Sequence, residues 1–192
     1  RAHEQARTCG AELWNWVHSQ GWKQWAWIET PLAHSMAEAF IEGFLLAAYQ
    51  YGVFKDQSRA DQTSQLEIWL PEPMRAGMEK RRQIVAAQCW ARDLVNTPPA
   101  HLTADLFAHW VHEQLEPQGV EVRILRKAQL QALKMGGLLG VNRGSQDEPT
   151  FTILEWRPQE VDPPSAPLVL VGKGVTYDSG GLNLKSREPM AW

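Results

Sequence analysis

Residues 168–181 have the sequence LVLVGKGVTYDSGG, a wholly apolar run that passes directly into a glycine-rich loop with charged and hydroxyl side chains. A wholly apolar run of this length is typical of a strand buried on both faces of a parallel sheet. Ligands of open α/β sheets bind just beyond the carboxyl ends of such strands. We therefore expect residues 168–171 to form a buried strand and the loop after it to carry a functional site.

Upstream of this stretch, helical and strand-like patterns alternate. Apolar residues spaced three to four apart predict helices over 4–20, 36–48, 76–95, 104–115 and 128–134. Alternating or aromatic-rich runs predict strands over 25–28, 66–70, 120–124 and 151–156, and polar residues 55–65 predict an exposed loop. The sequence thus indicates the α/β class.

The caps and buried faces of these helices can also be predicted. Ser35 and Thr103 are the expected N-caps of the second and fourth helices, and residues 96–99, NTPP, are expected to end the third. The expected buried residues of the first helix are Ala6, Cys9, Leu13, Trp16 and Val17. Those of the third are Ile84, Ala87, Ala91, Leu94 and Val95.

Composition narrows the class of protein. The 192 residues carry 19 Lys and Arg against 22 Asp and Glu, so no basic field favours nucleic acid or an anionic membrane as a partner. No apolar run is long enough to span a bilayer. Two cysteines cannot build a disulfide framework, which indicates free thiols and a reducing, cytoplasmic location.

The tryptophans and histidines each allow two interpretations. Ten tryptophans could form a stacking platform for sugars or bases, but their helical and strand spacing favours packing in cores and interfaces. His109 and His112 lie one helical turn apart beside Glu113, yet the spacing differs from His-Glu-x-x-His, which favours a solvated helix face over a zinc site. His101 lies in an expected loop and could line a site.

The glycine-rich loop does not match either common phosphate-binding pattern. A Walker loop requires Ser or Thr after Gly-Lys, whereas Gly174 follows Lys173, and a dinucleotide fingerprint requires glycine where Tyr177 stands. The alternative to a functional site is a tight turn that carries surface charges, and the loop pattern by itself leaves both interpretations open.

Three segments in order resemble the leucyl aminopeptidase family of two-metal enzymes. They are 91–99, ARDLVNTPP; 135–145, MGGLLGVNRGS; and 171–181, VGKGVTYDSGG, followed by Lys185. The resemblance implies a partial N-terminal α/β domain over 1–75, a connecting helix over 76–97 and the start of a mixed-sheet α/β catalytic domain over 98–192.

The resemblance also implies chemical roles in this loop. Lys173 would be a ligand of one metal, Asp178 a carboxylate bridging both metals, and Lys185 an electrophile beside the substrate carbonyl. Two divalent ions, Mn or Zn, would act on peptides with a free N-terminus, with a leucine-type preference and in a hexamer. A lysine binds metal only as the neutral amine, and removing its proton at pH 7 costs about 4.6 kcal/mol that coordination must offset.

The resemblance further implies that the remaining metal-binding carboxylates of this family would correspond to positions after Trp192. Two ligands from one loop are too few for the coordination that divalent ions require, so we expect the 192-residue chain to hold no stable metal pair and to be inactive. The alternative is a non-catalytic scaffold or binding domain of the same fold.

Overall fold

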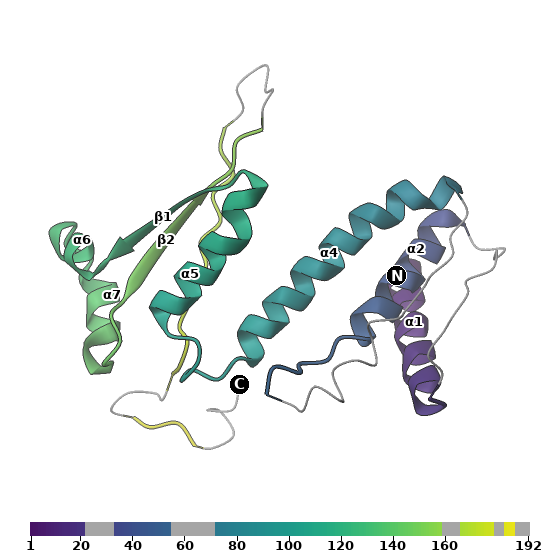
Figure 1. The fold of residues 1–192 in the computed structure, drawn as a ribbon, viewed down its shortest axis with the longest axis horizontal. Helices are drawn as coiled ribbons and strands as arrows, with labels where there is room; N and C mark the ends of the chain where they lie inside the picture. Colours follow the sequence, from purple (N-terminus) through teal and green to yellow (C-terminus); the bar gives the residue numbers. More distant parts are fainter. Residues whose placement is uncertain (22–32, 55–71, 159–165, 179–182, 187–192) are drawn as a thin grey trace. The chain divides into compact units, whose positions relative to one another are not determined.

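The chain forms two compact units, Arg1–Asn96 and Thr97–Trp192. The computed structural model describes residues 1–21, 33–54, 72–158, 166–178 and 183–186 (Figure 1). The division of the sequence into three domains at 75 and 97 remains a prediction. The expected strands over 25–28 and 66–70 and the expected loop over 55–65 lie outside the described residues.

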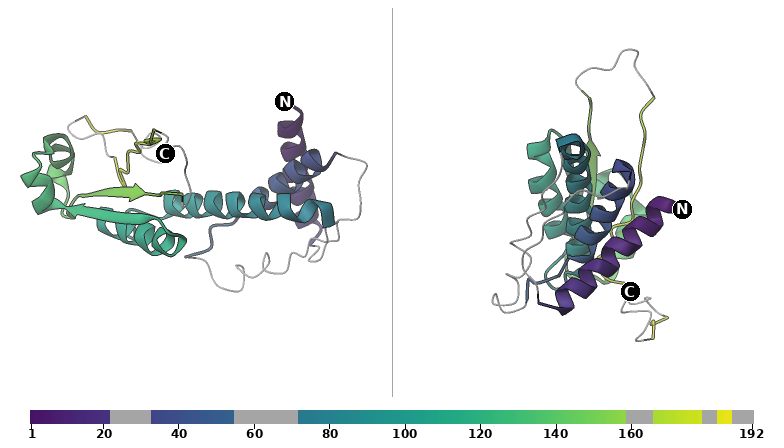
Figure 2. Two further views of the ribbon diagram at one scale, coloured as in Figure 1. Left: turned by 90° about the horizontal axis from the view of Figure 1, so that it is seen from above. Right: turned by 90° about the vertical axis from the view of Figure 1, so that its right-hand side faces the viewer.

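The first unit contains three described helices, α1 (Ala2–Ser19), α2 (His34–Ala47) and α4 (Glu72–Asn96). Helix α2 packs against α1 on one side and against α4 on the other, and the crossing of α1 and α2 is visible in both views of Figure 2. All three helices were expected from the apolar periodicity. Helix α4 ends at Asn96, directly before Thr97-Pro98. This end was expected, because a proline disfavours the helical conformation of the residue before it.

The buried face of α1 agrees with the expected one in part. Ala6 and Val17 are buried as expected, and Gly10 and Trp14 are buried with them. Cys9 is exposed and Trp16 is 52% exposed. The reason is a close helix crossing. A Cβ on Gly10 would collide with the carbonyl oxygen of Phe40 in α2, so the side of α1 that carries Gly10 faces α2.

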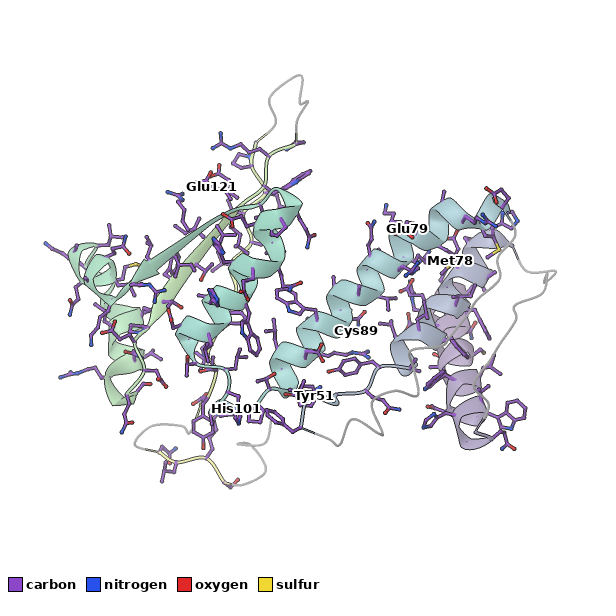
Figure 3. The ribbon with its side chains drawn as sticks, viewed as in Figure 1. Tyr51, Met78, Glu79, Cys89, His101 and Glu121 are labelled. Carbon is purple, nitrogen blue, oxygen red and sulfur yellow. The ribbon has the colours of Figure 1, made fainter. Side chains whose placement is uncertain are left out.

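A small methionine-rich cluster joins α2 to α4. Its buried members are Ala37, Ile41, Met74 and Met78, with Phe40 and Leu45 packed around them. Figure 3 labels Met78 together with its neighbour Glu79, which is exposed. The predicted face of α4 is wrong, since Ile84, Ala87, Ala91 and Val95 are exposed and the stripe containing Met74, Met78 and Val85 is buried instead.

The beginnings of α2 and α4 also differ from expectation. Residue Ala33 occupies the N-cap position of α2 without a side-chain hydrogen bond, and Ser35 lies inside the helix, so the Ser35 cap is wrong. Helix α4 begins at Glu72 and includes Pro73 near its start, where a proline is tolerated because the first backbone N–H groups have no helical partner.

The second unit contains a two-stranded antiparallel sheet together with several short helices. Helix α5 (Ala104–Leu115) is followed by the 3-10 turn η1 (Glu116–Gln118), strand β1 (Glu121–Arg126), helices α6 (Lys127–Ala132) and α7 (Gly136–Val141), the 3-10 turn η2 (Asn142–Gly144) and strand β2 (Thr150–Glu155). Strands β1 and β2 pair antiparallel, with Val122 opposite Leu154. Helix α5 lies along this pair, as Figures 1 and 2 show.

The start of α5 is fastened to both strands. The Thr103 hydroxyl accepts a hydrogen bond from the Leu106 backbone N–H at 3.3 Å, which confirms the expected cap. Asp105 forms an ion pair with Arg126 at the end of β1. Thr150 Oγ1 donates to the Ala104 carbonyl oxygen at 3.1 Å, so the first turn of α5 contacts β2 as well.

The expected strand over 168–171 is absent from the structure. These residues have no regular structure and are between 74% and 93% exposed. A strand needs a neighbour that takes up its backbone N–H and C=O groups, and among the described residues β1 and β2 pair only with each other. Within the described parts of the chain, no helix is long and apolar enough to cross a bilayer.

Candidate functional site

The glycine-rich loop brings two of its three predicted functional residues into direct contact. The Lys185 ammonium donates a hydrogen bond to Asp178 Oδ2 at 2.8 Å, and the two side chains are 34% and 49% exposed, respectively. An ion pair this open to water is weak, because solvent screens the attraction. The two side chains therefore lie together and remain accessible to a ligand.

The third predicted residue, Lys173, lies on the same loop and is exposed. Its neighbour Gly174 passes close to α5, since a Cβ added there would lie 3.3 Å from Cε1 of Phe107. Such a contact is tighter than ordinary van der Waals packing, so glycine lets the backbone pass the aromatic ring. The contact places the beginning of the loop against α5.

The donor atoms of this loop suit a divalent cation. Asp178 offers a hard carboxylate oxygen, and a lysine amine that has lost its proton offers nitrogen. The described residues contain no cluster of three or more histidine, cysteine, aspartate or glutamate side chains that could complete a metal site. Asp178 and Lys173 thus carry donor atoms of a suitable chemical kind, and the structure brings Asp178 into contact with Lys185.

Each histidine of the α5 pair lies beside a glutamate four residues further along the chain. His109 Nε2 lies 3.3 Å from Glu113 Oε1, and His112 Nε2 lies 3.4 Å from Glu116 Oε1. Each pair spans one helical turn with partly or fully exposed side chains, which agrees with the solvated helix face expected from the sequence.

The comparisons with known proteins assign the family. Residues 89–192, more than half of the chain, match the cytosol aminopeptidase family, catalytic domain. The chain belongs to the cytosol aminopeptidase family. This match confirms the resemblance that the three sequence segments carry.

Curated relatives of this family member cover both of its units. A probable cytosol aminopeptidase of Chlorobium phaeobacteroides is 37% identical over 167 residues, which are 81% of this chain and 33% of that protein. One from Chlorobaculum tepidum is 35% identical over 179 residues, 86% of this chain and 35% of that protein. The chain therefore spans about a third of the length of these relatives.

Solved structures share its fold. The bottromycin maturation enzyme BotP superimposes with a TM-score of 0.78 at 30% identity, covering 99% of this chain and 40% of that one. The cytosol aminopeptidase of Coxiella burnetii gives 0.67 at 25% identity, covering 81% and 32%. A second BotP structure, with a TM-score of 0.76, 28% identity and coverage of 95% and 39%, is a complex with Mn. The prediction of a partial α/β aminopeptidase fold is confirmed.

The structure gives a role to a second segment that sequence reasoning left without one. In the 91–99 segment of this cytosol aminopeptidase chain, Asp93 Oδ1 accepts a hydrogen bond from the Tyr49 hydroxyl at 2.8 Å, and Asn96 Nδ2 donates to that hydroxyl at 3.1 Å. Arg92 donates to the Leu46 carbonyl oxygen at 2.7 Å and lies over the Tyr49 ring. The segment thus ties the end of α4 to the end of α2.

A charged cluster inside the first unit also escaped the sequence analysis. Glu42 is 7% exposed and accepts hydrogen bonds from Arg7 of α1 and Arg81 of α4, while Arg81 also pairs with Glu38 at 3.1 Å. Burial would raise the pKa of Glu42, but the hydrogen bonds from Arg7 and Arg81 outweigh it and hold this pKa below its usual value. Helical periodicity carries no signal for such a cluster, because its members come from three helices.

Proposed function

We propose that the protein to which this chain belongs is a metal-dependent aminopeptidase that removes N-terminal residues from peptides, with a leucine-type preference. The observation that supports it is the contact between Lys185 and Asp178 on the loop whose sequence marks the family. Membership alone indicates a peptidase. In this contact the Asp178 carboxylate, which suits a cation, is hydrogen-bonded to the Lys185 ammonium, which suits an oxyanion.

In this proposal each residue of the loop has one task. Asp178 and Lys173 would hold two divalent ions, Mn or Zn, together with donors outside the described residues; the Mn complex of BotP supports this choice of metal. When bound, such ions activate water and polarise the scissile carbonyl. The substrate would be a peptide with a free N-terminus.

Lys185 would act on the substrate directly. It must keep its proton, so that the ammonium donates to the carbonyl oxygen as negative charge develops there. Water adds to the carbonyl carbon, the C–N bond then breaks, and the leaving amine takes up a proton. Losing one such donor typically raises the barrier by about 3 kcal/mol. The exposure of Lys185 and Asp178 leaves room for a substrate beside them.

The setting and assembly follow from the same proposal. We infer a cytoplasmic enzyme that forms a homo-hexamer, with the catalytic site in the second unit and without nucleic-acid or membrane partners. The 192-residue chain is expected to hold no stable metal pair, because its described residues supply two donors only.

Hydrolysis of leucine p-nitroanilide tests this function. The full-length protein should hydrolyse it in the presence of Mn or Zn and lose activity with a chelator, whereas the 192-residue chain should be inactive. Activity of the short chain that survives the chelator would contradict the two-metal proposal. A full-length protein that is folded, metal-loaded and inactive on several aminoacyl anilides would favour the scaffold alternative.

A further inference from the structure

The glycine-rich loop contacts helix α5 at one of its described glycines. A Cβ added to Gly174 would lie 3.3 Å from Cε1 and 3.8 Å from Cδ1 of Phe107. A Cβ added to Gly172 would have no atom within 4 Å. Neither glycine has a positive φ. Gly174 therefore differs from Gly172 in the space beside it, and not in any need for a left-handed backbone.

Helix α5 gives the aromatic ring of this contact a fixed support. The Phe107 backbone N–H donates to the Thr103 carbonyl oxygen at 2.9 Å, within the capped first turn. This turn is tied to β1 by the ion pair of Asp105 with Arg126, and to β2 by the hydrogen bond from Thr150. Phe107 itself is half-buried. The position of the ring is therefore set by a helix that both strands hold.

The chain that enters the loop has little support of its own. Residues 168–171 have no regular structure and are between 74% and 93% exposed. Segments with few buried contacts open at a small cost in free energy. A contact that joins such a segment to a well-held helix therefore has a large share in deciding where the loop lies.

We propose that Phe107 is a positioning residue, whose ring packs on the backbone at Gly174 and so sets the position of the loop that carries Lys173 and Asp178. The effect on the position of the loop rests on the contact alone, and the effect on hydrolysis rests in addition on the proposed function. Phe107 lies outside the three segments that resemble the family, so the resemblance gives it no role.

An exchange of size between the two residues tests the contact. An alanine in place of Gly174 comes too close to Cε1 of Phe107, so the ring or the loop must shift by a few tenths of an ångström. A leucine in place of Phe107 has no ε carbon but keeps a carbon at the δ position, where the distance of 3.8 Å is an ordinary van der Waals contact. Gly174→Ala should therefore disturb the loop when made alone and be tolerated together with Phe107→Leu.

Fluorine NMR of the 192-residue chain labelled with 4-fluorophenylalanine observes the contact. The chain has five phenylalanines, and the resonance that disappears in Phe107→Leu belongs to Phe107. Gly174→Ala should move this resonance, because the added methyl group lies against the ring. Gly172→Ala should leave it in place, because its methyl group meets no atom. A resonance that moves in both variants, or in neither, would overturn the contact.

Tryptic cleavage after Lys173, followed by mass spectrometry, measures how firmly the loop is held. Phe107→Ala leaves the cleavage site unchanged and should raise the initial rate there by roughly threefold to tenfold, since the protease cuts the chain only after it leaves α5. Phe151→Ala is the matched control, because it removes a phenyl group that is 39% exposed on β2. Equal acceleration in both variants would mean a general loosening of the second unit and would contradict the positioning role.

In the full-length protein the same exchange of size should affect the hydrolysis of leucine p-nitroanilide. Misplacing a reacting group by about 1 Å can cost about a hundredfold in rate, so the smaller shift in Gly174→Ala should lower kcat by roughly threefold to tenfold, with a lesser change in KM. Adding Phe107→Leu should restore most of the lost kcat. A protein that is merely destabilised would not regain activity when a second side chain of the same unit is shortened.

The possible failures are distinguishable. If the wild type is active but Phe107→Leu does not rescue Gly174→Ala, the positioning role is wrong and the proposed function stands. If the folded full-length wild type hydrolyses no aminoacyl anilide, the proposed function is wrong, and the fluorine resonance and the cleavage rate still decide whether Phe107 positions the loop.

Discussion

Gly10 of α1 lies so close to Phe40 of α2 that a Cβ on the glycine would collide with the Phe40 carbonyl oxygen. Gly43 of α2 makes the reciprocal approach to the Arg7 carbonyl oxygen. Two glycines, one from each helix, therefore let the backbones of α1 and α2 meet. The crossing also brings Trp14 edge-on to Phe44, with ring centroids 5.2 Å apart.

Replacing Gly10 with alanine should destabilise the first unit. The added methyl group forces α1 away from α2, and such overpacking typically costs about 1–3 kcal/mol of the free energy of unfolding. Urea unfolding followed by tryptophan fluorescence measures it. Gly140→Ala in α7 is the control, since no atom lies within 4 Å of its added Cβ and the exchange favours helix. Equal stability of both variants would contradict the tight crossing.

Glu42→Gln should also destabilise the first unit, by about 1–3 kcal/mol, because it leaves Arg7 and Arg81 without the carboxylate they share. Glu79→Gln removes a carboxylate from the exposed face of α4, where the Arg82 partner lies 3.8 Å away, and should change stability by less than about 0.5 kcal/mol. Chemical denaturation of the two variants gives the comparison. A larger loss for Glu79→Gln would be evidence against the cluster.

The same carboxylate predicts a pH dependence. The pKa of Glu42 is lowered in the folded state, so the unfolded chain takes up the proton first as the pH falls below the ordinary value of 4.5. Stability from Glu42 is therefore present above that value and lost as the pH falls through the lowered pKa. The stability difference between wild type and Glu42→Gln should shrink in acid, as denaturation midpoints across the acid range will show. A difference that stays constant from neutral pH downward would refute this account.

The two cysteines should differ in reactivity. Cys9 is exposed, whereas Cys89 on α4 (Figure 3) is partly buried, and burial raises the pKa of its thiol. Iodoacetamide at mildly alkaline pH should alkylate Cys9 several times faster than Cys89 in the folded chain. Peptide mass spectrometry gives both rates, and denaturation in urea should bring them together. Faster labelling of Cys89 would mean that α4 does not protect it.

In the full-length protein, Asp178→Ala and Lys185→Ala should fail in different ways. Asp178→Ala should lose bound metal, whereas Lys185→Ala should keep metal and lower kcat by roughly a hundredfold to a thousandfold, the usual effect of losing an oxyanion donor. Metal analysis of the purified proteins and anilide hydrolysis check the two readouts separately. The reverse pattern would exchange the roles assigned to these residues.

Local patterns in the sequence were sufficient to predict several elements of the second unit. The Thr103 cap, helix α5 and strands β1 and β2 all depend on periodicity or on a side chain bonding its own backbone, which neighbouring residues control. The same holds for the end of α4 at Asn96, since Pro98 restricts the residue before it. The loop 172–178 was recognisable because Gly172, Lys173, Gly174 and Asp178 follow one another in the order of the family's segment.

Contacts between segments that are distant in the sequence could not be predicted and became visible only in the tertiary structure. The buried face of α1 follows Gly10, because backbone approach to α2 outweighs the burial of Cys9 and Trp16, and the Glu42 cluster joins residues of three helices. The sequence marked Asp178 and Lys185 as members of one loop. Only the folded chain shows that the Lys185 ammonium donates a hydrogen bond to the Asp178 carboxylate. The distance between two side chains seven residues apart in a loop depends on the tertiary structure.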